Sequence, residues 1–131
     1  SGKVKDLTES NNLIKKTLEI IEYFNPTYWY LENPQTGSLK QQEFMEYLPY
    51  NDVDYCKYGF LYRKRTRIWN NNENWNGKML CKKGNICLNK KDGRHENFRW
   101  ITRTGNNGKN TRWEQRISIP QELIEEIIIQ S

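Results

Sequence analysis

The stretch FNPTYWYLENP, residues 24–34, decides how this chain folds. Ahead of it, apolar residues recur at helical spacing from Thr8 to Phe24, which predicts an amphipathic helix. Asn25-Pro26 ends that helix, because a residue that precedes proline is disfavoured in the α region. The aromatic run at 28–31 then predicts a short buried strand. A helix, a tight turn and a strand form half of an α/β unit, so we expect an α/β fold.

The rest of the chain extends this pattern and divides it into three parts. We predict a short helix at 41–47, strands at 53–56 and 67–69, and a C-terminal helix that begins near Pro120. Between Asn70 and Arg116, polar and glycine residues replace aliphatic ones, which predicts loops. We therefore expect a core over residues 1–69, an irregular polar insert over 70–115, and a C-terminal helix within 116–131 that packs on the core.

Composition favours a polyanionic partner. The 131 residues are one domain's worth of protein, and 21 Lys and Arg against 16 Asp and Glu give a formal net charge of +5. Together with 13% aromatic residues, this charge favours nucleic acid as the partner. No apolar run approaches the roughly 20 residues that cross a bilayer, and no signal pattern opens the chain, so we expect an intracellular protein, nuclear or cytoplasmic, without a membrane partner.

Glu32 is the first candidate functional residue. It stands where the predicted strand 28–31 runs out into a loop. In open α/β sheets, ligand sites lie just beyond the carboxyl ends of the strands. The alternative is that Glu32 caps a turn or faces solvent.

Two segments in order carry a family resemblance. FNPTYWYLENP at 24–34 and VDYCKYGFLYRKRTRIW at 53–69 resemble DNA cytosine-5 methyltransferases, in which a strand ending in Glu-Asn precedes a strand that leads through Tyr-Gly into a basic segment. Pro34 stands where that family has valine, a form similar to a divergent phage, viral and protist branch. RISIPQELIEEI, at 116–127, is similar to the family's last motif. The resemblance implies the C-terminal half of a Rossmann-like methyltransferase sheet with flanking helices, with the 70–115 insert as a possible target-recognition region.

The resemblance also implies roles for single residues. The family flips the target cytosine out of the duplex, adds a cysteine thiolate to C6, and holds the N3 edge of the base with a glutamate. Glu32 matches that glutamate, and Asn33 would tie the loop by side-chain hydrogen bonds. Ser118, in the last motif, would contact the cofactor S-adenosylmethionine.

A basic segment follows the second predicted strand. The resemblance implies that Arg63, Lys64, Arg65 and Arg67 contact DNA phosphates. Tyr62, Lys64 and Thr66 occupy the places of Gln, Arg and Arg in the wider family. The alternative is a solvated edge strand, since edge strands carry Lys and Arg to block further pairing.

Two family features are missing from the sequence. There is no Gly-x-Gly, as in the family's cofactor loop, and no Pro-Cys, the family's nucleophile. We expect both upstream of Ser1, because the helix at 8–24 is similar to the one that follows the catalytic loop. The resemblance thus implies part of an S-adenosylmethionine-dependent DNA cytosine-5 methyltransferase, inactive without a complementary N-terminal half. The alternative is a non-catalytic DNA-binding or regulatory subunit derived from the same fold.

The cysteines leave two possibilities open. Cys56, Cys81 and Cys87, with the single histidine His95, could form a Cys₃His zinc site that keeps the polar insert folded. The spacing of Cys81 and Cys87 is wider than usual, and Cys56 falls in a predicted core strand, which favours unligated thiols. Separately, residues 92–110 are similar to the end of HNH nuclease domains, but an HNH site needs a second histidine, so at most DNA binding follows from that similarity.

Overall fold

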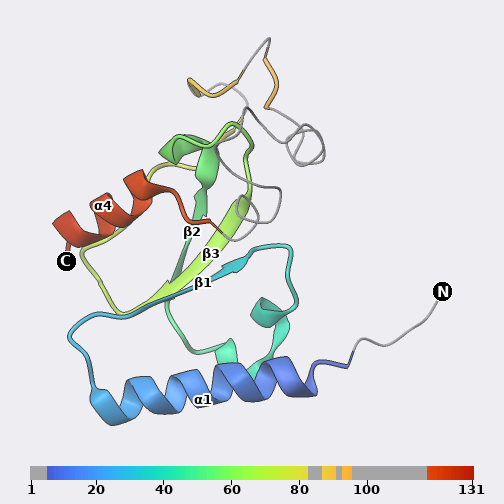
Figure 1. Cartoon of the computed structure of the whole chain (residues 1–131), viewed down its shortest axis with the longest axis vertical. Helices are drawn as coiled ribbons and strands as arrows, with labels where there is room; N and C mark the ends of the chain where they lie inside the picture. The colour runs from blue at the N-terminus through green and yellow to red at the C-terminus, as the bar shows by residue number, and fades with distance from the viewer. Residues whose placement is uncertain (1–5, 83–86, 91–92, 96–117) are drawn as a thin grey trace.

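In the part of the chain that the structure describes, the fold is a small sheet with one α-helix on each side. The computed structural model describes residues 6–82, 87–90, 93–95 and 118–131. Helix α1 (Thr8–Phe24) runs along the bottom of Figure 1, and helix α4 (Gln121–Ile129) lies to the left of the strands. The strands are β1 (Tyr30–Pro34), β2 (Tyr50–Asp54) and β3 (Arg65–Asn70). They pair in the order β1-β3-β2, and both pairings are antiparallel.

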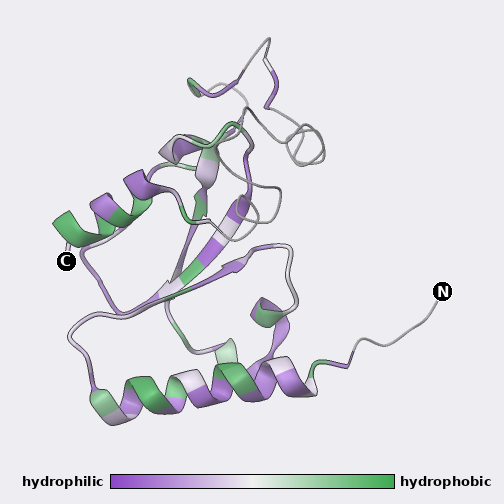
Figure 2. Cartoon of the chain, in the orientation of Figure 1, coloured by the Kyte–Doolittle hydropathy of each residue, from purple (hydrophilic) through white to green (hydrophobic). Residues whose placement is uncertain are grey.

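Helix α1 has the bounds that the apolar spacing predicted. Asn25 ends it in the left-handed conformation, at a φ of 44°, and its N–H donates to the carbonyl of Ile21. Asparagine tolerates this conformation better than most residues, and it closes the last turn of the helix. Ile14 and Leu18 pack towards the sheet, whereas Leu13 and Phe24 are exposed. Figure 2 shows hydrophobic and hydrophilic residues mixed along α1. One face of α1 therefore covers the sheet.

The strands differ from the predicted ranges in ways that matter for the site. Strand β1 begins at Tyr30 and continues through Glu32, which pairs with Ile68 of β3. Glu32 therefore lies within a strand and does not cap a turn. Strand β2 ends at Asp54, before Cys56. Strand β3 is the central strand, so the edge-strand reading of the basic segment was wrong.

Short 3₁₀ turns replace the predicted helix at 41–47 and the end of the predicted strand at 53–56. The helix expected at 41–47 is a pair of turns, η1 (Leu39–Gln41) and η2 (Glu43–Met45). A third turn, η3 (Tyr55–Tyr58), holds Cys56 outside the strand. Gly59 ends η3 at a φ of 97°, a conformation open to glycine and strained for other residues. Tight i→i+3 turns suit these short connections, because each is too short to form a stable α-helix.

Side chains alternate between the two faces of the sheet and build two hydrophobic clusters. On the α1 side, Leu39, Met45 and Trp69 form a buried cluster. On the α4 side, the buried cluster contains Val53, Tyr55, Tyr58, Ile68, Trp75 and Leu123. Trp75 belongs to the predicted polar insert, so the beginning of that insert packs into the core.

Helix α4 forms where the last motif predicted a helix. Pro120 precedes its first turn, and Leu123 is fully buried against the sheet. The expected α/β character is therefore confirmed at the level of helices packed on a sheet. Among the residues described, no helix combines the length and hydrophobicity needed to cross a membrane.

Candidate functional site

Glu32 and Asn33, adjacent in β1, lie on opposite faces of the sheet. Successive side chains of a strand point to opposite sides. Glu32 and its neighbour Ile68 face α4, and Asn33 faces α1. The two predicted site residues therefore have separate surroundings.

Glu32 lies in a hydrophobic pocket beneath α4. The pocket has a volume of about 210 Å³, and its lining residues are Tyr30, Glu32, Ile68, Ile119, Leu123, Ile124, Ile127 and Ile128. Glu32 is its one carboxylate, and its Oε2 accepts a hydrogen bond of 3.1 Å from the hydroxyl of Tyr55. This arrangement matches the usual form of a ligand site, with apolar walls and few polar groups that fix orientation.

Tyr55 orients Glu32, and sequence reasoning missed it. The side chain of Tyr55 is fully buried, and burial together with the charge of Glu32 raises the pKa of its hydroxyl well above the ordinary value. The hydroxyl therefore stays protonated and can donate to Glu32. Lys64 places its Nζ 5.2 Å from the centre of the Tyr55 ring, and burial lowers the pKa of Lys64 while Glu32 opposes that change. The available signal was the position of Tyr55 at the start of the stretch YCKYG, residues 55–59.

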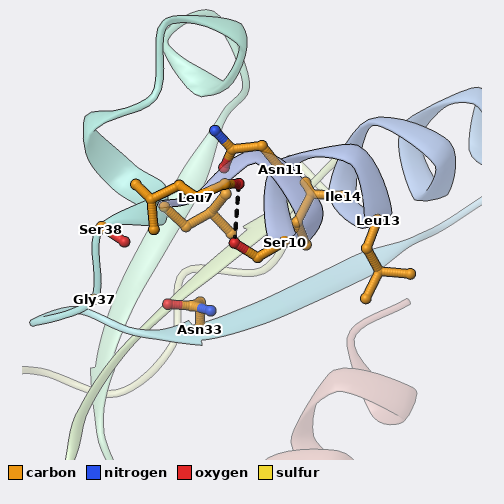
Figure 3. A pocket seen from close by; sticks show the side chains of 9 residues that line it. Leu7, Ser10, Asn11, Leu13, Ile14, Asn33, Gly37 and Ser38 are labelled. Atoms are coloured by element: carbon orange, nitrogen blue, oxygen red, sulfur yellow. Dashed lines mark hydrogen bonds between the residues drawn. The ribbon is translucent and has the colours of Figure 1, made fainter. Parts of the chain in front are cut away.

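Asn33 lines a second pocket, on the opposite face of the sheet. Figure 3 shows Asn33 pointing towards the first turn of α1, with Gly37 and Ser38 beside it. The pocket is about 350 Å³ in volume, and no charged side chain is among its lining residues, which include Ser10 and Asn11. A Cβ at Gly37 would lie 2.5 Å from Asn33 Oδ1, so the loop after β1 needs glycine there. These contacts are consistent with a structural role for Asn33.

Two of the four predicted DNA-contacting cations are paired with aspartates. Arg65 donates two hydrogen bonds to Asp54, of 3.0 and 2.9 Å. Arg67 donates two to Asp52, of 2.9 and 3.1 Å, and its guanidinium lies 3.7 Å from the centre of the Tyr50 ring. Antiparallel pairing sets each arginine directly opposite its aspartate on strand β2. The four cations therefore do not form one free basic surface.

Arg63 belongs to a different group of cations. It is exposed and lies in the segment that leads into β3. Burial lowers the pKa of His95, and the nearby charges of Lys90, Arg63 and Lys57 lower it further, while that of Asp54 opposes the change. We call Lys57, Arg63 and Lys90 the basic patch. Sequence analysis did not single out Lys57 or Lys90, because the patch combines residues from distant parts of the chain.

The structure brings together the four residues weighed as a zinc site. The Sγ atoms of Cys56, Cys81 and Cys87 and the ring nitrogen of His95 all lie within 4.8 Å of one another. Cys56 and Cys81 are buried, and Cys87 and His95 are partly buried. The wide spacing of Cys81 and Cys87 along the chain is compatible with this cluster, because the residues between them only have to let the two side chains reach the same point.

Ser118, the predicted cofactor contact, lies just ahead of α4. Its neighbour Ile119 lines the Glu32 pocket, while Ser118 itself is not among the lining residues. S-adenosylmethionine carries a sulfonium, an amino group and a carboxylate, and a site for it needs polar and charged partners. The Asn33 pocket is uncharged and the Glu32 pocket holds one carboxylate, so these two pockets do not fit the whole cofactor.

The HNH-like stretch lies largely outside the described residues. Of residues 92–110, the structure describes 93–95. Within these three, His95 joins the cysteine cluster.

Comparison with known proteins supports the resemblance found in the motifs. No protein-family model and no solved structure matches the chain. A curated protein of Frog virus 3 (isolate Goorha), named "Probable DNA (cytosine-5)-methyltransferase", is 33% identical to it over 127 residues. The match takes in 92% of this chain, and the chain spans 58% of the length of that relative. The predicted resemblance is therefore confirmed: over nearly all of its length, this chain is similar to a viral protein named as a probable DNA (cytosine-5)-methyltransferase.

Proposed function

We propose that this chain is the part of a DNA cytosine-5 methyltransferase that holds the target base and contacts the DNA backbone. The observation that carries the proposal is Glu32, a carboxylate hydrogen-bonded to Tyr55 in an apolar pocket, at the position that matches the family's base-binding glutamate. The similarity to the viral methyltransferase supports it. A complementary polypeptide, continuous with this chain or separate, would supply the cofactor loop and the cysteine nucleophile, and the sheet would belong to a larger Rossmann-like sheet.

In this proposal the pocket recognises the edge of a flipped cytosine. An extrahelical base needs apolar contact for its ring and a polar partner for its Watson–Crick edge. The isoleucines of α4 and Ile68 would provide the first, and Glu32 the second. The bond from Tyr55 occupies Oε2 of Glu32 and limits the rotation of the carboxyl group. Preorganised partners of this kind stabilise charge that develops in the transition state.

The basic patch would contact the phosphates beside that base. Arg63 is exposed, and Lys57 and Lys90 lie near the same histidine. Cations paired with carboxylates contribute less to phosphate binding, because their charge is already compensated. We therefore assign Arg65 and Arg67 to the stability of the sheet. We assign DNA contact to the basic patch and to Lys64, which follows Arg63 in the sequence. S-adenosylmethionine, held mainly by the complementary polypeptide, would supply the methyl group.

The decisive experiment compares Glu32→Gln with Glu22→Gln in the assembled enzyme, meaning this chain together with the polypeptide that supplies the cofactor loop and nucleophile. Glutamine can still donate a hydrogen bond to N3 but cannot transfer a proton, so we expect a single-turnover rate reduced by roughly 10²-fold or more, with DNA affinity changed much less. Glu22 is exposed on α1 and controls for loss of a negative charge.

The outcome that would contradict the proposal is equally specific. An unchanged rate in Glu32→Gln with a lowered unfolding midpoint would reduce Glu32 to a structural residue. Tyr55→Phe supplies a second measurement, because it removes the bond to Glu32 while keeping the ring in the core. We expect a smaller loss of rate from Tyr55→Phe than from Glu32→Gln. DNA binding without any methyl transfer by the assembled enzyme would favour the non-catalytic subunit.

A further inference from the structure

We infer that Cys56, Cys81, Cys87 and His95 bind a structural zinc ion that fastens the polar insert to the sheet. Tetrahedral zinc, with bonds of about 2.3 Å to sulfur and about 2.0 Å to nitrogen, sets sulfur and nitrogen ligands about 3.5 Å apart. His95 Nε2 lies 3.5 Å from the Sγ of Cys81 and 3.5 Å from that of Cys87. All four ligand atoms fall within 4.8 Å of one another. This spacing is that of ligands around one metal ion.

The three cysteines are held in place by backbone contacts that a metal does not have to create. Cys56 is fixed in η3, and its carbonyl accepts a hydrogen bond of 2.6 Å from Asn89 Nδ2. The backbone N–H of Cys81 donates 2.8 Å to the buried carboxylate of Asp54. Cys87 begins a turn that is closed by the N–H of Lys90. Because residues from the core and the insert converge on one point, the cluster is more than a chance pair of thiols.

The chemistry of the ligands favours zinc over calcium and magnesium. Thiolate and imidazole are soft or borderline ligands, which select zinc, whereas calcium and magnesium take oxygen ligands. Four protein ligands and no open position define a structural zinc site, as opposed to a catalytic one. The three cysteines are free in the structure, and an odd number cannot all pair as disulfides. A Cys₃His set is therefore best satisfied by zinc.

Charge balance supports the same conclusion. Binding releases a proton from each of three thiols, so Zn²⁺ with three thiolates and a neutral imidazole carries a net charge of −1. The charges of Lys57, Arg63 and Lys90 act on His95, and so does the opposite charge of Asp54. Among these groups, three cations against one carboxylate leave an excess of positive charge, which attracts a zinc centre of charge −1. Zinc would also hold the basic patch in place beside the site.

The test uses the 131-residue chain, purified untagged in the presence of a phosphine reductant and zinc, and then dialysed. We expect about one zinc ion per chain by elemental mass spectrometry, and thiolate-to-metal charge-transfer bands after replacement by Co²⁺. Cys87→Ser and His95→Ala, which change the two partly buried ligands, should each lower the bound zinc at least about fivefold. Leu88→Ala is the matched control, because Leu88 is 92% exposed and adjoins Cys87.

Two results would overturn the inference. One is a wild-type chain with intact thiols that carries less than about a tenth of an equivalent of zinc and gives no charge-transfer band. The other is equal zinc in Cys87→Ser and Leu88→Ala. The wild-type measurements decide the question even if a variant fails to fold. Because no readout involves DNA or methyl transfer, the result stands apart from that of the proposed function.

Discussion

Replacement of Glu126 by alanine should destabilise the protein far more than the same change at its neighbour Glu125. Glu126 Oε2 accepts hydrogen bonds from the hydroxyl of Tyr58, at 2.5 Å, and from Nε1 of Trp75, at 3.1 Å. The Tyr58 and Trp75 side chains are each 1% exposed. One carboxylate thus joins three parts of the chain: helix α4, turn η3 and the beginning of the insert.

The magnitude follows from the donors left behind. A buried donor without its partner costs about 1–3 kcal/mol, and two donors lose theirs in Glu126→Ala. Glu126 itself is half-buried, so water can reach part of the vacated space, which places the total near the lower end, at about 2–4 kcal/mol. Glu126→Gln keeps an acceptor oxygen and should cost about half as much.

The assay is urea unfolding followed by tryptophan fluorescence, on Glu126→Ala, Glu126→Gln and Glu125→Ala. Glu125 is exposed on the same helix, and its carboxylate accepts one hydrogen bond, from the side chain of Gln121. We expect Glu125→Ala to remain within about 0.5 kcal/mol of the wild type. Equal free energies of unfolding for the two alanine variants would refute the assignment of Glu126 as the acceptor for both buried donors.

Three further predictions concern activity, DNA binding and pH. The isolated chain should transfer no methyl group from S-adenosylmethionine to DNA, since its sequence lacks the Gly-x-Gly loop and the Pro-Cys nucleophile. Methylation of DNA by the purified chain, with contaminants excluded, would contradict this prediction. Affinity for duplex DNA, measured by fluorescence anisotropy, should fall about 10²-fold or more over a fourfold rise in salt if several phosphates are contacted. Joint replacement of the three cations of the basic patch by alanine should make the affinity for DNA less dependent on salt. Arg67→Ala should lower the stability of the protein and leave the salt dependence of DNA binding unchanged. Burial raises the pKa of Tyr62 to about 12, so the tyrosine of the unfolded state ionises first as the pH rises. The free energy of unfolding should therefore decline between about pH 10 and pH 12. Tyr62→Phe should reduce that decline.

The amino-acid sequence alone determined the elements that depend on local patterns. Helix α1 has its predicted bounds because apolar spacing and the Asn25-Pro26 stop act within a few residues. The C-terminal helix behind Pro120 follows from the same kind of local signal. The Glu-Asn-Pro and Tyr-Gly motifs were sufficient to predict the resemblance that the viral methyltransferase confirmed.

Strand register decided which charges are available. In the sequence, Arg65 and Arg67 could not be distinguished from Arg63, since all three lie in one basic segment. Antiparallel pairing with β2 then set Asp54 opposite Arg65 and Asp52 opposite Arg67. A cross-strand partner depends on register, and register is set by packing over the whole sheet, so this pairing was not readable from the basic segment itself.

Only the tertiary structure brought the side chains of the two sites together. Glu32 meets Tyr55 because β1 and the turn after β2 are both arranged around the central strand β3. Cys56 meets His95, 39 positions further along the chain, through contacts of the insert with Asp54 and with the Cys56 carbonyl. Sequence spacing disfavoured that cluster, because spacing rules describe ligands from one short segment. Ligands from separate segments are placed by the folding of the chain around them.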